Sequence, residues 1–183
     1  MNTTTNFTTL TLAALLGACT SQPMATMPAF SQAGLPAAVQ VPTGHKVALE
    51  SVGIGEITYE CREKAGAAGQ HEWVFVGPNA ALQDRSGKTI GRYVGPPATW
   101  ALGDGSALTG TQLAVAPAAA GSIPLQLVKA NPATGTGVLT GVTHIQRVAT
   151  QGGVAPASTC DAMTKGRREI VRYQADYIFW KAA

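Results

Sequence analysis

Charged residues are scarce in this chain, and its first 45 residues contain none. Lys, Arg, Asp and Glu make up 13% of the 183 residues, and the first of them is Lys46. The 13 basic residues are scattered from Lys46 to Lys181, and the formal net charge is only +3. Because nucleic-acid binding needs a concentrated basic surface, the sequence predicts no nucleic-acid partner.

The motifs of common enzyme classes are also missing. The chain contains no GxSxG turn for a hydrolase serine, no HExxH pair for zinc, and no GxGxxG with the acidic residue that a dinucleotide site needs. His45, His71 and His144 are too far apart in the sequence to form a local metal site. We therefore expect no cofactor and no metal, and the sequence assigns no catalytic residue.

The uncharged start contains one short apolar run, Leu10–Ala18. About nine apolar residues suit the core of a signal peptide and are too few to cross a bilayer as a helix. The run ends in Leu16-Gly17-Ala18-Cys19, which resembles the bacterial lipobox, whose cysteine thiol is acylated. The sequence predicts a signal peptide over 1–18 and a membrane anchor on Cys19. Secretion after cleavage near Ala18 or Ala25, and an uncleaved segment, stay as alternatives.

Residues 19–42 are rich in Pro, Ala, Ser and Met and show no helix or strand period. We interpret them as a tether that precedes a single domain over 43–183, since one core suits a chain of this length. The predicted location is therefore outside the cytosol, as an outer-membrane or periplasmic lipoprotein or as a secreted protein.

From Gly44 onward, short runs of alternating polarity are separated by Gly and Pro, which is typical of strands. Ile57, Tyr59 and Cys61 fall on one face, and the same alternation recurs over 171–179. Asp104-Gly105 favours a tight hairpin. The other expected strands lie near 46–50, 72–76, 88–94, 107–116, 123–130 and 138–148. The sequence predicts an all-β fold of eight to ten mainly antiparallel strands, a sandwich or a barrel, with little helix outside the signal peptide.

Three cysteines are present, and lipid on Cys19 would leave Cys61 and Cys160 as a pair. Exported proteins meet oxidising conditions, so we expect these two to form a structural disulfide. A redox pair or a metal site is the alternative, but the close CxxC spacing that would support it is missing.

A few polar and aromatic residues are weak candidates for a ligand site. Trp100 beside the Asp104 turn could stack on a sugar or an aromatic ligand, or could simply fill the edge of the core. His144 and Arg147 share one expected strand, but residues three apart point to opposite faces, and Arg147 could instead bond a neighbouring loop. His45 with Glu50 invites a general-base role, although nothing supplies a nucleophile.

Several segments occur in an order that resembles a known family. The most specific part runs from Ile145-Gln146-Arg147 through Gly152-Gly153-Val154-Ala155-Pro156 to Cys160, and Tyr59-Glu60-Cys61, Thr99-Trp100 and Ala175-Asp176-Tyr177 contribute. Over residues 42–180 the chain resembles domain-of-unknown-function family 3455. Members are exported bacterial and fungal proteins without established catalytic residues, so the resemblance supports the domain boundaries and the Cys61–Cys160 pairing but implies no reaction.

This chain departs from the family pattern at three places. Arg92-Tyr93 stands where a His is usual, residues 95–100 are longer than the usual Gly-Pro-Thr-Trp, and Leu125-Gln126 replaces a Trp-Leu pair. Arg92 joins the candidate ligand-binding residues, since a pocket that gathers it with His144 or Asp104 would favour an enzyme.

The sequence as a whole favours an envelope or extracellular binding module for an unidentified ligand, such as a carbohydrate or another envelope component. An envelope enzyme of hydrolase type, with a site assembled from distant strands, is the first alternative. A structural envelope protein is the second.

Overall fold

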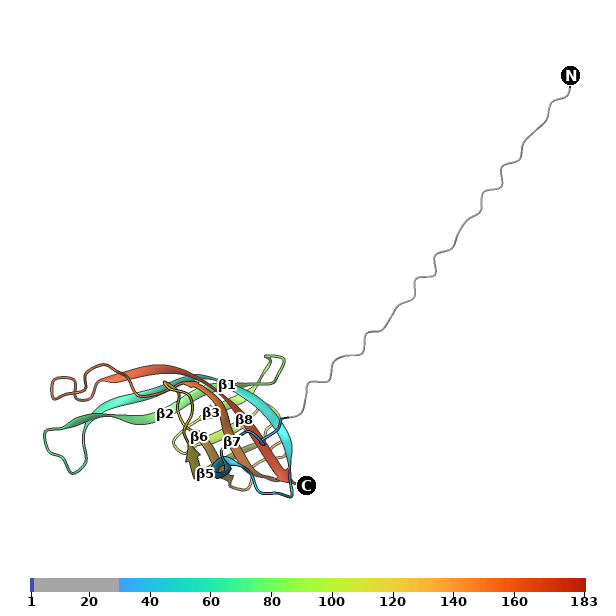
Figure 1. The fold of residues 1–183 in the computed structure, drawn as a ribbon, viewed down its shortest axis with the longest axis horizontal. Helices are drawn as coiled ribbons and strands as arrows, with labels where there is room; N and C mark the ends of the chain where they lie inside the picture. The colour runs from blue at the N-terminus through green and yellow to red at the C-terminus, as the bar shows by residue number, and fades with distance from the viewer. Residues whose placement is uncertain (2–29) are drawn as a thin grey trace.

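A computed structural model describes Met1 and residues 30–183 of the chain. Eight antiparallel strands follow one another around a closed barrel, and β1 pairs with β8 to complete it (Figure 1). The strands are β1 (His45–Glu63), β2 (His71–Gln83), β3 (Thr89–Val94), β4 (Thr99–Leu102), β5 (Ala107–Ala116), β6 (Leu125–Ala130), β7 (Val142–Gly152) and β8 (Arg168–Ala182). The predicted all-β class is confirmed, and of the two expected forms the chain adopts the barrel.

The structure differs from the expected strands at β1 and at β4. The runs at 46–50 and 57–62 are parts of one strand, because β1 continues through Gly53 and Gly55 without a turn. Gly53 is required there, since a Cβ at this position would lie 2.4 Å from a ring carbon of Tyr177. The short β4 was not predicted, and it follows directly on the turn at residues 95–98.

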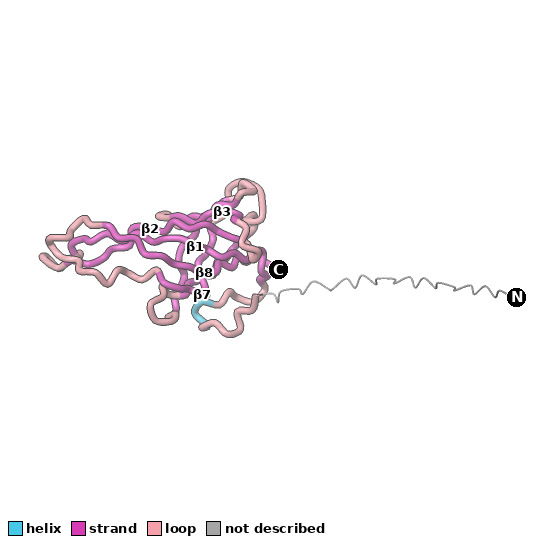
Figure 2. Tube along the Cα trace, turned by 90° about the horizontal axis from the view of Figure 1, so that it is seen from above, coloured by secondary structure: helices cyan, strands magenta, loops and turns pink. Residues whose placement is uncertain are grey.

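We call the end of the barrel where β1 finishes its upper end, which lies on the left in Figure 1. The lower end, where β1 begins and β8 finishes, lies on the right. At the upper end β1, β2 and the start of β8 continue beyond the other strands as an arm, which lies opposite the C-terminus (Figures 1 and 2). Cys61 in the arm is joined to Cys160 in the β7–β8 connection, with 5.4 Å between their Cα atoms. The predicted disulfide is therefore confirmed, and it fastens this connection to the arm.

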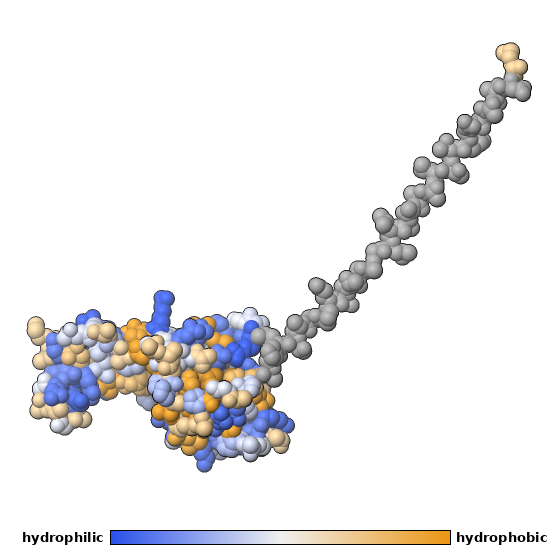
Figure 3. Space-filling model, viewed as in Figure 1, coloured by the Kyte–Doolittle hydropathy of each residue, from blue (hydrophilic) through white to orange (hydrophobic). Residues whose placement is uncertain are grey.

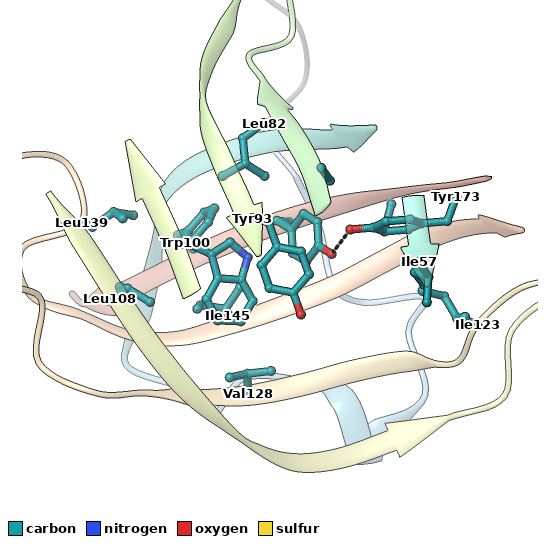
Figure 4. Packing of buried hydrophobic residues seen from close by; sticks show 14 of the residues in the cluster. Ile57, Leu82, Tyr93, Trp100, Leu108, Ile123, Val128, Leu139, Ile145 and Tyr173 are labelled. Atoms are coloured by element: carbon teal, nitrogen blue, oxygen red, sulfur yellow. Dashed lines mark hydrogen bonds between the residues drawn. The ribbon is translucent and has the colours of Figure 1, made fainter. Parts of the chain in front are cut away.

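Apolar and aromatic side chains fill the inside of the barrel. Tyr93, Trp100 and Tyr173 lie among aliphatic residues such as Leu82 and Ile145 (Figure 4). An eight-stranded barrel is just wide enough to be filled by its own side chains. The interior is thus a packed core, and any ligand must bind at one end of the barrel or on its outer surface.

The lower end is closed by the β6–β7 connection, residues 131–141. Leu139 of this connection is fully buried in the core. Its backbone N–H donates to Ser106 Oγ at 3.3 Å, and the N–H of Val138 donates to Asp104 Oδ2 at 2.7 Å. The β4–β5 turn therefore holds this connection, which we call the plug, in place.

The segment that leads into β1 packs on the outside of the barrel. Residues 30–42, which contain the short helix η1 (Ala37–Val39), form a strap over the outer face of β5 to β8. Val39 and Val41 of the strap are buried against Leu127, Ile178 and Trp180. The predicted boundary at residue 43 stays a prediction, but the strap is packed against the domain.

One buried glutamine ties the strap to the barrel. Gln146 in β7 is 0% exposed. Its amide nitrogen donates to Val39 O at 2.7 Å and to Gln32 Oε1 at 3.0 Å, and its amide oxygen accepts from Trp180 Nε1 at 2.9 Å. A buried polar group is stabilising only when its partners are present, so this network fixes where the strap lies.

Gln146→Ala should loosen the strap without opening the barrel. The change leaves Val39 O and Trp180 Nε1 without partners, and each such buried group costs about 1–3 kcal/mol. We expect the free energy of unfolding to fall by about 2 kcal/mol and hydrogen exchange to rise in residues 30–42. Gln126→Ala, at an exposed glutamine pair on neighbouring β6, is the matched control. Equal effects of the two substitutions would contradict this role.

In the part of the chain that the structure describes, no helix is long and apolar enough to span a membrane. The predicted signal peptide, the lipid site at Cys19 and most of the tether lie outside the described residues, and they stay predictions.

Candidate functional site

The residues singled out from the sequence are spread over the barrel. Trp100 is 1% exposed and stacks on Tyr93 inside the core, with 4.6 Å between ring centroids. Its ring therefore does not face the surface. Arg92 is exposed on β3, where it lines a shallow depression with Ala101 and Leu102.

Asp104 serves the lower end of the barrel. Its Oδ1 accepts from the Ser106 N–H and hydroxyl at 2.9 and 2.7 Å, and Oδ2 accepts from the Val138 N–H. These hydrogen bonds, led by that of the Ser106 hydroxyl, lower the pKa of the Asp104 carboxyl. The carboxylate oxygens are thus used to fix the plug.

His45 and His144 lie together near the lower end, on the outer face. Their rings meet edge to face with 4.8 Å between centroids. Burial lowers the pKa of His144, and the nearby His45 and Lys129 lower it further. Over residues 30–183 no group of three or more His, Cys, Asp or Glu is arranged to hold a metal ion. His144, Asp104 and Arg92 line three separate depressions, so they do not converge on one pocket.

Arg147 lies at the other end of the barrel, among all four tyrosines of the chain. It faces Tyr177 directly across the β7–β8 pair, and its positive charge acts on the pKa of every tyrosine. We call Arg147, Tyr59, Tyr93, Tyr173 and Tyr177 the tyrosine–arginine mouth. It lies at the base of the arm.

The hydroxyls of the mouth differ in their partners. Tyr59 donates to Gly153 O at 2.8 Å, and the Tyr173 and Tyr177 hydroxyls share a hydrogen bond of 3.2 Å, drawn as the dashed line in Figure 4. Tyr93 is only 7% exposed, yet its hydroxyl has no hydrogen-bond partner among the described residues. The side-chain polar atoms of the described residues that are both fully buried and unpartnered are Trp100 Nε1 and Thr150 Oγ1, so the Tyr93 hydroxyl reaches solvent and is an open donor at the mouth.

All four phenols stay protonated at neutral pH. Burial raises the pKa of Tyr93 and Tyr59, and the charge of Arg147 offsets this only in part. Burial also raises the pKa of Tyr173 to about 12 and the pKa of Tyr177 well above its usual value. The mouth therefore presents hydrogen-bond donors, and none of its phenols can act as a base near neutral pH.

The Arg147 guanidinium has no acidic partner. Its Nε and Nη2 donate to Pro124 O at 3.2 and 2.9 Å. No carboxylate of residues 30–183 lies within ion-pair distance of it, and residues 2–29 contain no Asp or Glu. A half-buried cation without a counter-charge attracts anions.

Arg147 and the rings of Tyr93, Tyr173 and Tyr177 line a small cavity of about 20 Å³. This volume is enough for one water molecule or one ligand oxygen. Phe75, Pro78 and Ile123 form its apolar rim, and Phe75 is 51% exposed. Figure 3 shows apolar residues where the arm joins the barrel. The arrangement can hold an oxyanion on the guanidinium and the Tyr93 hydroxyl, with an apolar body on the rim.

Sequence reasoning proposed Arg147 but missed the tyrosines. Tyr59, Tyr173 and Tyr177 lie on the core faces that strand alternation predicts, so they read as packing residues. The chain has only four tyrosines, and this small number was the one feature of the sequence that could have drawn attention to them as a group. The pairing of β7 with β8 places Arg147 opposite Tyr177, and closure of the barrel brings the other tyrosines to the same end.

Comparisons with known proteins agree with the boundaries of the barrel. A search of curated proteins finds no match, and a search of solved structures finds none either. Residues 42–181, which comprise the arm and all of the barrel except the last residue of β8, match a family described as "Protein of unknown function (DUF3455)". The chain belongs to this family.

Proposed function

We propose that this protein is an exported binding module that takes a small anionic ligand at the tyrosine–arginine mouth. The ligand class is a carboxylate, or a similar oxyanion, attached to an apolar or aromatic body. The single observation that carries the proposal is Arg147, a cation without an acidic partner that lies beside the unpartnered hydroxyl of Tyr93. Charge-assisted hydrogen bonds from such donors are the strong ones.

Binding is favoured over catalysis because of what lines the cavity. The lining residues are Ile57, Phe75, Pro78, Tyr93, Ile123, Arg147, Tyr173 and Tyr177. They include no Ser, Cys, His, Asp or Glu, and their phenols keep their protons. A hydrolase needs a nucleophile and a base within reach of its substrate, so the hydrolase alternative has less support at this site.

Attachment to an envelope is the second part of the proposal. The Cys61–Cys160 disulfide suits a compartment outside the cytosol. Phe30, where the described chain resumes, packs on Trp180 and donates its N–H to Glu50, towards the lower end of the barrel. Lipid on Cys19 would hold the protein from that end, and the mouth would face away from the membrane towards ligands in the envelope.

The test is equilibrium binding of aromatic and medium-chain carboxylates, with phenylacetate and octanoate as probes and their neutral amides as controls. We expect the carboxylates to bind and to perturb the NMR signals of Tyr93 and Phe75. Arg147→Gln should weaken binding by about tenfold to a hundredfold, because a hydrogen bond to a charged group is worth about 1.5–3 kcal/mol. Tyr93→Phe, which removes only the free hydroxyl, should weaken it by about tenfold.

Arg172→Gln is the matched control. Arg172 is an exposed arginine on β8, one residue before Tyr173 and on the opposite face, and its loss should leave binding unchanged. Failure of every carboxylate to bind, or equal affinities for the Arg147→Gln protein and the unsubstituted protein, would reject the proposal. Turnover of an ester or amide probe would instead revive the enzyme alternative.

A further inference from the structure

The outer part of β2 forms an open sheet edge in the arm. β2 pairs with β1 from His71 to Gln83, but it meets β3 only from Asn79 onward. Residues 72–76 therefore have β1 on one side and, among the residues that the structure places, no strand on the other. An edge of this kind is a template for pairing with another strand.

The backbone groups that point out of this edge follow from the β1 pairing. The Cys61 N–H donates to Arg167 O at 2.9 Å, and Cys61 O accepts from the Gly166 N–H at 2.8 Å, so both Cys61 groups point away from β2. Trp73 of β2 lies opposite Cys61 of β1. Phe75, two residues further along β2, lies opposite Tyr59. In an antiparallel ladder this alternation turns the N–H and C=O of both Trp73 and Phe75 towards the open edge.

The other edge of the arm is covered along its length, whereas this one is irregular only at Val76, where the β1–β2 register shifts. The start of β8 carries Arg168, Glu169 and Arg172, and the β7–β8 connection bonds to it through Gly153 N–H to Arg172 O and Ser158 Oγ to Glu169. Charges and covering loops are the usual means of preventing edge pairing. The segment Trp73–Val76 has no charge, no Pro and no Gly.

We infer that two copies of this chain associate through their β2 edges, antiparallel about a two-fold axis at Val74. In this register Trp73 lies opposite the partner's Phe75, and the two residues exchange both backbone hydrogen bonds because both turn their polar groups outward. Val74 meets its own copy. Glu72 lies opposite the partner's Val76, so no like charges face each other across the pair.

The pairing also explains why the occupant is a second copy. Trp73 and Phe75 both turn their backbone groups outward, and Val74 lies between them. A two-fold rotation about Val74 places each of these residues opposite the other on the second copy, which is the condition for an isologous contact. The rotation pairs an indole with a phenyl ring on the same face, and such cross-strand aromatic pairs are stabilising. The dimer places the partner's Trp73 beside Phe75 at the rim of the mouth.

The first test is cross-linking with Val74→Cys in a chain that also carries Cys19→Ser, so that the introduced thiol is the only unpaired one. Residues directly opposite on paired strands have Cβ atoms about 4.5–5.5 Å apart, which a disulfide can bridge. Mild oxidation should give a covalent dimer on a non-reducing gel. Ile170→Cys, at a 62% exposed position on the other edge of the arm, is the matched control and should stay monomeric. Equal cross-linking of the two variants would overturn the inference.

The second test is sedimentation of the chain with native Val74. A small edge-to-edge contact should be weak. We therefore expect the mean mass of the protein to rise towards twice the monomer mass as its concentration rises from about 1 to about 100 µM. Val74→Lys places two like charges on the axis and should stay monomeric, with an unchanged circular dichroism spectrum. A native protein that is monomeric throughout this range would contradict the dimer, whether or not the mouth binds carboxylates.

Discussion

Trp100→Ala should lower the free energy of unfolding by about 3–5 kcal/mol, the range for removing a large aromatic from a packed core. Trp100 is enclosed by Tyr93, Tyr177 and Phe179, with ring centroids 4.6, 6.0 and 6.5 Å away. Urea unfolding followed by circular dichroism measures the loss without relying on tryptophan fluorescence.

The same substitution should also disturb the mouth. The indole packs on the rings of Tyr93 and Tyr177, so its removal leaves both rings less firmly held, and carboxylate binding should weaken with stability. Trp100→Phe is the control, since it keeps an aromatic ring and removes an indole N–H that has no hydrogen-bond partner. A Trp100→Ala protein with the stability of the Trp100→Phe protein would show that the ring is not a central part of the core.

The strands could be predicted where alternation is strict. Ile57, Tyr59 and Cys61 share one face of β1, and the alternate residues of β8 line the core as expected. The same rule failed at Gly53 and Gly55, which read as a break between strands. They are small because the Tyr177 ring and the neighbouring β2 backbone come close to β1 there, and this is a property of the closed barrel that local sequence does not carry.

Closure itself could not be read from the sequence. A sandwich and a barrel use the same alternation, and the choice depends on β1 pairing with β8, more than 100 residues apart in the chain. The short β4 was missed because four residues are too few to show a period. The arm was missed for a related reason, since nothing local shows that β1 and β2 continue past the barrel.

The site was less predictable than the fold. Arg147 was proposed as one of several scattered polar residues, and its partners come from β1, β3 and β8. Asp104 looked like a ligand-binding residue because an exposed Asp-Gly turn leaves the use of its carboxylate open. The plug at residues 131–141 uses that carboxylate, and the connection that supplies the plug has no signature of its own.

Removal of the disulfide is the second change with a large expected effect. Replacing Cys61 and Cys160 with alanine should lower the free energy of unfolding by about 2–5 kcal/mol, because the bond closes a loop of 99 residues in the unfolded chain. The bond lies in the arm, so the folded state should lose order there first. Hydrogen exchange should rise in residues 58–75 and 153–168, while the barrel strands stay protected.

An ion pair between the same two segments provides the matched control. Lys165 Nζ lies 3.3 Å from Glu63 Oε2, and both side chains are exposed, so Lys165→Ala should leave exchange in the arm almost unchanged because exposed ion pairs contribute little. The disulfide also holds the β7–β8 connection, whose Gly153 accepts from the Tyr59 hydroxyl at the mouth. The double alanine variant should therefore bind carboxylates more weakly even where it remains folded. Full affinity together with a frayed arm would show that the mouth is assembled by the barrel alone.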